Sequence, residues 1–481
     1  MRATRDAPWV VWFLPTLCMV AATAAVGSAE NQALADAAKR RDTAAVRALL
    51  QSDVDVNVNV PQADGATALH WAAHWNDLNM ADLLIGAGAR AGGENDLHVT
   101  PLSLACANGS AAMVERLLAA GADHTPPPPA IPPVMTCSRT GSLAAVRALL
   151  SAGADANALE SVRGQTALMW AVAQDHADIV RLLLQHGADP AARSYAARRV
   201  VNRANPNDPN LSVVGDVFEG GSTPLLLAAR QGSVASAAAL LDAGAPVEDI
   251  APAGGTALVL AAHSNQAAMV ALLLERGANP NDIGAGYTAL HAAVLRGNLD
   301  TVRALIARRA NVDARVRHGT PTTRATQDYF LSEGMTSATP LWLAARFLEV
   351  DIMRALLSAG TDWRLSLQDG TSTLMAAAGL PASPPLFDRR DRLLLLRAPD
   401  EEQALEAVRL LLGVGGTADT ANAAGETALH GAATRNYAAV ARFLVEQGAR
   451  LDARNADNAT PLDLANGPEV ARALQSLGAN R

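Results

Sequence analysis

One six-residue pattern recurs along most of this chain and restricts its fold more than any other feature: Thr, a small residue or Pro, Leu, any two residues, Ala. Copies begin at Thr67, Thr100, Thr166, Thr223, Thr256, Thr288, Thr339, Thr427 and Thr460, with a looser copy at Thr373. Regular copies start 32 or 33 residues apart, as from Thr223 to Thr256 and from there to Thr288. A fixed period of this size predicts stacked copies of one small unit, so the 481 residues need not divide into several globular domains.

Each copy has the residues that start and stop a pair of helices. Thr accepts a backbone N–H bond at a helix N-terminus, and Pro, where it follows, suits the first helical position. A second apolar pattern then ends in Gly-Ala-Asp or Gly-Ala-Asn, as at Val180, Leu183, Leu184 and Gly187. Its spacing of three and four predicts a helix with one buried face, which Gly ends by adopting a positive φ. One such pair cannot bury its apolar face alone, so neighbouring units must pack together.

This pattern resembles the ankyrin repeat, and the match runs from about residue 31 to the C-terminus. The resemblance implies an all-α solenoid of about 12 helix-turn-helix units, each with a hairpin finger nearly at right angles to its helices. We expect residues 30–60 and 460–481 to cap the two ends, with the repeats at 61–459 between them. A degenerate copy is expected near Pro132, after the Pro126–Pro129 run.

The same resemblance implies where a partner would bind, namely the concave face of the first helices and the tips of the fingers. The positions that face this groove include Trp71, Trp75, Trp170, Arg230, Gln231, His263, Arg296, Arg346, Phe347 and Arg435. Aromatic residues and Arg are common anchors of protein interfaces. The alternative for any one of them is structural, with Trp filling a gap between helices and Arg keeping the surface soluble. We therefore expect a non-enzymatic scaffold for a protein partner, and the row of arginines favours an acidic one.

Three intervals between copies are too long by about 18 to 24 residues for a period of roughly 33. They predict insertions near 191–221, 314–337 and 380–402. The first two follow the end of a second helix and should extend fingers, and both mix Arg with aromatic residues, a composition found at binding surfaces. The third falls between the two helices of one unit and should emerge from the opposite edge. Tolerated loop growth is the alternative for all three, because surface insertions cost little free energy.

Residues that would carry catalysis or hold a cofactor are scarce. His70 and His74 are four apart on a predicted helix, a spacing that can place two metal ligands on one face, but no Glu completes the HExxH zinc-protease pattern. His70, His291 and His430 also occupy the His position of the ankyrin motif, where the resemblance implies hydrogen bonds between neighbouring turns. The sequence has no P-loop, dinucleotide-binding loop or haem-attachment motif, so we expect no cofactor. A metal-binding protein or hydrolase with its site in the insertions is the alternative function.

Net charge and the first 29 residues bear on partners and location. The formal net charge of -8 argues against a protein that binds nucleic acid over its whole surface.

Arg2 and Arg5 precede an apolar stretch, Trp9 to Val26, and small residues follow at 27–29, which is the order of a secretory signal peptide. We expect residues 1–29 to be removed and the protein to be periplasmic or secreted, and an uncleaved N-terminal membrane anchor is the alternative. Lys39 is the only lysine, an Arg bias that suggests a high-GC bacterial gene.

Two cysteines would remain after such processing, Cys106 and Cys137, at nearly equivalent positions of neighbouring units. A disulfide between them would suit an oxidising compartment. Packed helices, however, usually lie about 8–10 Å apart, beyond easy disulfide reach. We therefore expect two small buried thiols.

Overall fold

The computed structural model describes residues 26–52, 56–205, 208–318, 335–380 and 401–479, and it describes side-chain burial outside 26–31 and 198–219. Most of the predicted signal segment thus lies outside the described residues. The chain divides into two compact units, residues 1–123 and 124–481, which we call the N-terminal and C-terminal units. No helix in the described ranges is long and apolar enough to cross a membrane.

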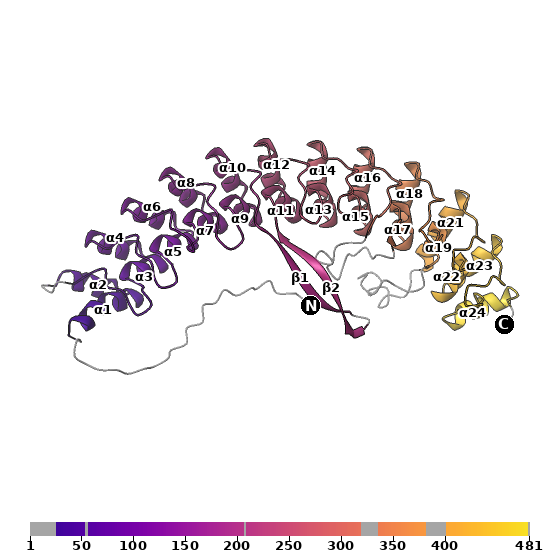
Figure 1. The fold of residues 1–481 in the computed structure, drawn as a ribbon, viewed down its shortest axis with the longest axis horizontal. Helices are drawn as coiled ribbons and strands as arrows, with labels where there is room; N and C mark the ends of the chain where they lie inside the picture. Colours follow the sequence, from indigo (N-terminus) through magenta and orange to yellow (C-terminus); the bar gives the residue numbers. More distant parts are fainter. Residues whose placement is uncertain (1–25, 53–55, 206–207, 319–334, 381–400, 480–481) are drawn as a thin grey trace. The chain divides into compact units, whose positions relative to one another are not determined.

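The N-terminal unit contains three helix pairs among its described residues. They are α1 (Val26–Lys39) with α2 (Thr43–Leu50), α3 (Ala68–His74) with α4 (Leu78–Gly86), and α5 (Pro101–Ala107) with α6 (Ala111–Ala119). First helices pack on first helices, α1 on α3 and α3 on α5, and second helices pack likewise from α2 through α4 to α6. The unit therefore has two layers of helices, one built from each half of the repeat (Figure 1).

The C-terminal unit continues this pattern with eight pairs and a final helix in its described part. The pairs are α7 (Pro133–Thr140) with α8 (Leu143–Ser151), α9 (Ala167–Ala173) with α10 (Ala177–Gln185), α11 (Pro224–Gln231) with α12 (Val234–Asp242), α13 (Ala257–His263) with α14 (Ala267–Glu275), α15 (Ala289–Leu295) with α16 (Leu299–Ala307), α17 (Pro340–Arg346) with α18 (Val350–Ser358), α19 (Thr373–Ala377) with α21 (Glu401–Gly413), and α22 (Ala428–Thr434) with α23 (Ala438–Glu446), followed by α24 (Pro468–Ser476). Consecutive first helices touch, as do consecutive second helices. The predicted all-α solenoid is confirmed, and the degenerate copy near Pro132 forms α7.

In most copies the opening Thr caps its helix as the pattern predicts, whereas the helix of the looser copy at Thr373 is capped by Ser372. Thr100 Oγ1 accepts the Ser103 N–H at 3.1 Å, which satisfies one of the donors that a helix start leaves unpaired. The Ala at the sixth position is fully buried in the copies before the last, as at Ala72 and Ala171, and is half-buried at Ala465. Its small side chain lets the first helices of adjacent repeats approach closely, so the recurring Ala follows from the stacking.

Side-chain amides join the loops of adjacent repeats. Asn157 Nδ2 donates to the Gly187 carbonyl oxygen at 2.9 Å, and Asn157 Oδ1 accepts the Asp189 N–H at 2.7 Å. Asn59 and Asn281 make the same bridge to the loop that follows theirs. Because each bridge reaches across one repeat, these bonds fix the rise from one repeat to the next.

The first predicted insertion forms an antiparallel ribbon between α10 and α11, whereas the sequence indicated only a longer finger. Strands β1 (Ala196–Asn205) and β2 (Asp208–Gly220) pair from Ala196 with Gly220 to Ala204 with Ser212, and a register shift follows. The several valines of both strands favour this conformation, because β-branched residues fit an extended backbone. The second insertion lies between α16 and α17 and the third between α19 and α21, and their central parts, 319–334 and 381–400, lie outside the described residues.

Cys106 and Cys137 are fully buried, and each of them is disulfide-bonded. The expectation of two free thiols is therefore wrong. It rested on the usual distance between packed helices, which depends on the side chains at each contact and does not decide a particular case.

Candidate partner-binding surface

Two predicted groove residues, Trp71 and Trp75, lie together at the C-terminal end of α3. Their ring centroids are 6.4 Å apart with planes inclined by 27°, and the His74 ring meets them edge-on at 5.8 and 4.5 Å. Trp71 Nε1 donates to Gln62 Oε1 at 2.8 Å, and Trp75 Nε1 donates to the Lys39 carbonyl oxygen at 3.2 Å. Both half-buried indoles are thus fixed in position, while His74 is exposed.

Trp170 has a similar environment in the C-terminal unit. Its Nε1 donates to Gln165 Oε1 at 3.0 Å, and the Arg139 guanidinium lies 5.1 Å from the ring centroid. In both units, then, a glutamine before the first helix orients the indole and a cation from the preceding first helix covers the ring. These cations were not among the predicted site residues. A basic residue one repeat period before each Trp is the sequence signal that could have revealed them.

Two of the four predicted arginines cap neighbouring helices. Arg296 Nε donates to the carbonyl oxygen of His263, the last residue of α13, and Arg435 Nε donates to the Gly379 carbonyl oxygen just beyond α19 at 3.3 Å. Helix C-termini leave carbonyl groups without partners, and a donor from the next repeat satisfies them. Arg296 and Arg435 therefore have a structural role, which leaves their guanidinium groups less available to a partner protein.

The remaining predicted residues differ in how far they are exposed. Arg230 and Gln231 are exposed at the end of α11, and His263 is half-buried beside Tyr287. Arg346 and Phe347 retain only 5% and 6% of their accessible surface. A side chain buried to that extent offers little surface to a partner, so the exposed pair on α11 is the better candidate.

The motif histidines connect adjacent repeats, as the resemblance implied. His291 Nδ1 accepts the Thr288 N–H at 3.2 Å, which leaves the proton on Nε2, and Nε2 faces the Ala338 carbonyl oxygen at 3.2 Å. His70 and His430 make the corresponding bonds. Burial lowers the pKa of His291 to about 4 and lowers the pKa of His70 and of His430 as well. These imidazoles are neutral links between turns.

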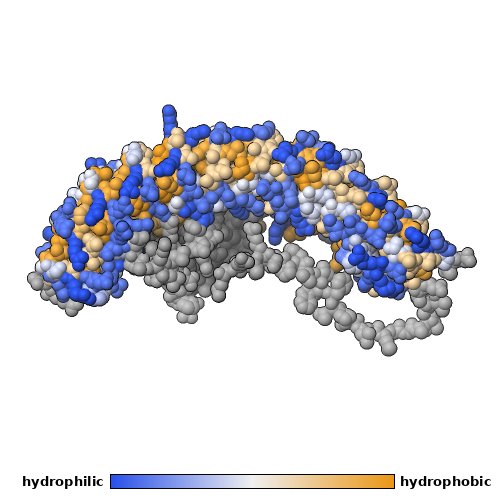
Figure 2. Space-filling view, turned by 180° about the vertical axis from the view of Figure 1, so that it is seen from behind, coloured by the Kyte–Doolittle hydropathy of each residue, from blue (hydrophilic) through white to orange (hydrophobic). Residues whose placement is uncertain are grey.

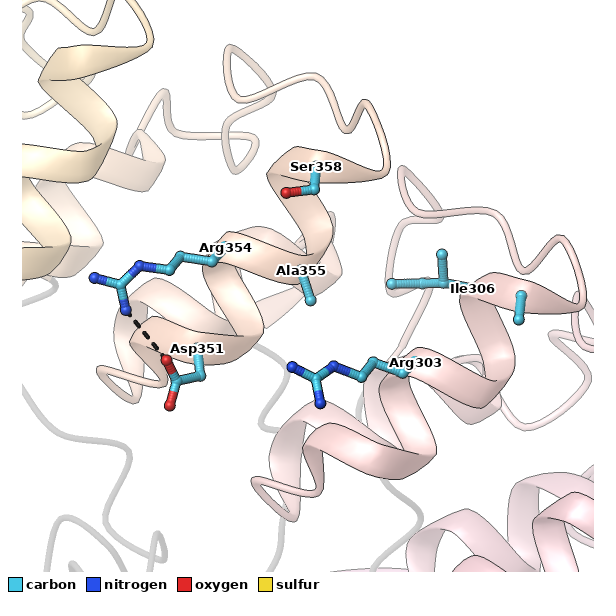
Figure 3. Close-up of a pocket in the computed structure, with 7 residues that line it drawn as sticks. Arg303, Ile306, Asp351, Arg354, Ala355 and Ser358 are labelled. Carbon is cyan, nitrogen blue, oxygen red and sulfur yellow. Dashed lines mark hydrogen bonds and ion pairs between the residues drawn. The ribbon is translucent and has the colours of Figure 1, made fainter.

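The alternative function, a metal-binding protein or hydrolase with its site in the insertions, would need a convergent cluster of titratable side chains. Within the described residues, which leave out 319–334 and 381–400 of the insertions, no group of three His, Cys, Asp or Glu side chains could hold a metal ion. A shallow hollow of about 470 Å³ lies between α16 and α18, lined by Arg303, Ile306, Asp351 and Arg354 among others (Figure 3). Arg354 is paired with Asp351 at 3.1 Å and also with Glu406. Exposed charges that pair with one another are not the convergent set of groups that catalysis requires.

The family model described as "Ankyrin repeats (3 copies)" matches residues 34–128, 102–194, 191–284, 247–316, 281–366 and 395–480. The chain belongs to the ankyrin-repeat family. Ankyrin repeats are generally protein–protein interaction modules and are typically not enzymes. In the view of Figure 2, hydrophobic and hydrophilic residues of the ankyrin array are interleaved on the surface, and no single large apolar patch dominates.

Two known proteins resemble parts of this ankyrin array. A stretch of 161 residues is 44% identical to the palmitoyltransferase Hip14 of Drosophila melanogaster and covers 32% of this chain and 24% of the fly protein. The chain thus spans about a quarter of the length of that relative. The crystal structure of the human ASB11 ankyrin repeat domain is 27% identical, with 51% of this chain and 98% of that chain covered and a TM-score of 0.42.

Proposed function

We propose that this ankyrin array is a non-enzymatic scaffold that binds a protein partner through the ends of its first helices and through its fingers. The supporting observation is that Trp170, Arg230 and Gln231 come from α9 and α11, which are neighbours in the first-helix layer. Arg230 and Gln231 are exposed, and Trp170 is half-buried with its N–H already bonded. Aromatic and Arg side chains presented from adjacent rigid helices are typical anchors of an interface.

The first insertion supports a role for the fingers. The base of the ribbon is bonded on both sides, because the Tyr195 N–H donates to the Arg163 carbonyl oxygen at 2.7 Å and Arg193 Nη1 donates to the Ile250 carbonyl oxygen at 3.1 Å. Tyr195 itself is 52% exposed. A ribbon with a fixed base and an exposed aromatic residue can present surface to a partner with little loss of entropy.

Charge reversal on α11 tests this function. The double variant Arg230→Glu, Gln231→Glu should lose proteins that the wild-type chain captures from a cell-envelope extract, because like charges and a lost anchor oppose binding. Arg303→Glu is the matched control, since Arg303 is exposed on α16 in the layer of second helices. Mass spectrometry would identify what each chain captures, and thermal unfolding would show that each is folded.

The expected result is a partner captured by the wild type and by Arg303→Glu but not by the α11 variant. Capture that survives the α11 change and disappears in Arg303→Glu would place the interface on the second helices instead. Stoichiometric zinc in the purified protein, or hydrolytic activity that depends on the insertions, would favour the alternative of a metal protein or enzyme.

We also propose that the protein is exported, to the periplasm or the medium. Two observations support this location: the order of basic, apolar and small residues in the first 29 positions, and the disulfide-bonded state of Cys106 and Cys137. Disulfides persist mainly in oxidising compartments. Cell fractionation with mass measurement of the N-terminus checks the proposal, and an unprocessed chain with free thiols in the cytosol would contradict it.

A further inference from the structure

The N-terminal unit carries a compact group of aromatic and basic side chains, which we call the tryptophan–cation cluster: Trp71, His74, Trp75, Lys39 and Arg41. Lys39 Nζ lies 5.0 Å from the Trp71 ring centroid, and the Arg41 guanidinium lies 5.1 Å from the Trp75 ring centroid. Each of the two neighbouring rings therefore carries one cation. Lys39, Arg41 and His74 are exposed, and the two indoles are half-buried.

The positive charges of the cluster are not neutralised within the described residues. Neither Lys39 nor Arg41 forms an ion pair there, although carboxylates are present on the same elements. Asp36 accepts from Gln62 Nε2 at 2.6 Å, and Asp42 accepts the Ala45 N–H at 2.9 Å. These carboxylates are bound to neutral donors, which leaves both cations available to an incoming anion.

The geometry of the cluster matches an extended peptide. The two rings are 6.4 Å apart. Two residues of an extended chain advance by about 6.6 Å, and side chains at alternate positions point to the same side. Side chains at positions i and i+2 of such a chain could therefore each lie over one indole and, if acidic, pair with the cation beside that ring.

We propose that the tryptophan–cation cluster binds an extended acidic segment of a partner protein, with Asp or Glu at alternate positions. The proposal rests on the scaffold function above and adds the chemistry of what the N-terminal unit recognises. Cations that rest on aromatic rings lose part of their hydration, so a carboxylate gains more from pairing with them than with a fully solvated lysine. The indole N–H groups are already bonded to Gln62 and Lys39, so the rings contribute apolar surface and the cations contribute recognition.

Synthetic peptides test the proposal on the full chain. A fluorescein-labelled decapeptide of alternating Glu and Thr should bind in an anisotropy titration, and the peptide with Gln in place of Glu should bind at least about tenfold more weakly because each lost carboxylate removes a charge-assisted bond. The double variant Lys39→Gln, Arg41→Gln should lower affinity for the Glu peptide by about tenfold or more. Raising the salt concentration should weaken this binding too.

Arg40→Gln is the matched control. Arg40 lies between the two cations in sequence and is also exposed, but it has no ring beneath it among the described contacts. Its loss should leave affinity for the Glu peptide within about twofold of the wild type, since charges away from the site act mainly through screened, long-range attraction. An equal loss in Arg40→Gln and in the double variant would overturn the proposal, because the segment would then be an unspecific basic patch.

Two further outcomes separate this proposal from the function it rests on. Equal binding of the Glu and Gln peptides, or tighter binding of a single-stranded oligonucleotide than of the Glu peptide, overturns the acidic-segment proposal. If the acidic-segment proposal fails but the α11 variant still loses its captured partner, the scaffold function stands. Only the proposal that the tryptophan–cation cluster binds an acidic segment is then wrong.

Discussion

Acid should weaken the C-terminal unit through His291, and the size of the effect follows from its surroundings. His291 is fully buried, and burial lowers the pKa of the imidazole from 6.5 to about 4. In the unfolded chain the same imidazole takes up a proton near its ordinary pKa. Between these two values the unfolded state binds the proton and the folded state does not, so stability is complete above pH 6.5 and falls as the pH is lowered toward 4.

Linkage gives the magnitude. For these two pKa values the free energy of unfolding drops by about 2 kcal/mol at pH 5 and by about 3 kcal/mol at pH 4 relative to neutral pH. The bonding pattern gives the cause in atomic terms. Nδ1 accepts the Thr288 N–H, so a second ring proton would point at a donor and disrupt the cap of α15.

Urea unfolding followed by circular dichroism measures the effect at several pH values. The variant His291→Gln should be less stable at neutral pH, because it loses the link to Ala338, but its stability should change less with pH than that of the wild type. Trp342→Phe, which also removes a buried hydrogen-bond donor but no imidazole, is the control and should keep the wild-type pH dependence. Identical pH dependences for the wild type and His291→Gln would refute the reasoning, because the imidazole would then contribute no linkage.

Three other changes probe the stacking. Leu183→Ala in α10 should destabilise by about 2–5 kcal/mol and can uncouple the repeats on either side of it, and a single sharp unfolding step with an unchanged midpoint would speak against this. Asn157→Ala breaks both bonds to the next loop and should cost about 1–3 kcal/mol, with faster hydrogen exchange at the Asp189 amide as the local readout. Trp342→Phe leaves the Thr371 carbonyl oxygen without its indole donor and should lower the unfolding midpoint, whereas an unchanged midpoint would mean that water replaces the donor at no cost.

The repeat could be predicted from the sequence because its signals are local. A Thr cap such as Thr100, a buried Ala such as Ala72 and a terminal Gly such as Gly187 each act within a few residues of their own position. Their constant period then determines how neighbouring units must pack, so the all-α array and the positions of its helices follow without knowledge of longer-range contacts.

The roles of individual surface residues could not be predicted in this way, because they depend on the preceding repeat. Arg296 and Arg435 belong to the same predicted row as Arg230, yet they donate to carbonyl groups at the end of the neighbouring helix. Arg346 is buried, which its position in the motif does not reveal. The pairing of β1 with β2 could not be predicted either, because a long insertion can adopt several conformations. The valines of the two strands favour the extended conformation only weakly.

The ribbon between α10 and α11 is attached to the loops on both sides of it. Its base is bonded to Arg163 in the repeat before and, through Arg193, to Ile250 in the repeat after. A force applied to the ribbon would therefore be transmitted to the repeat before it and to the repeat after it, and would not act on a single contact between repeats. For protein engineering, the distal part of the ribbon is therefore a place where the native sequence can be replaced by a foreign one. The hydrogen bonds at the base of the ribbon would then orient the inserted segment.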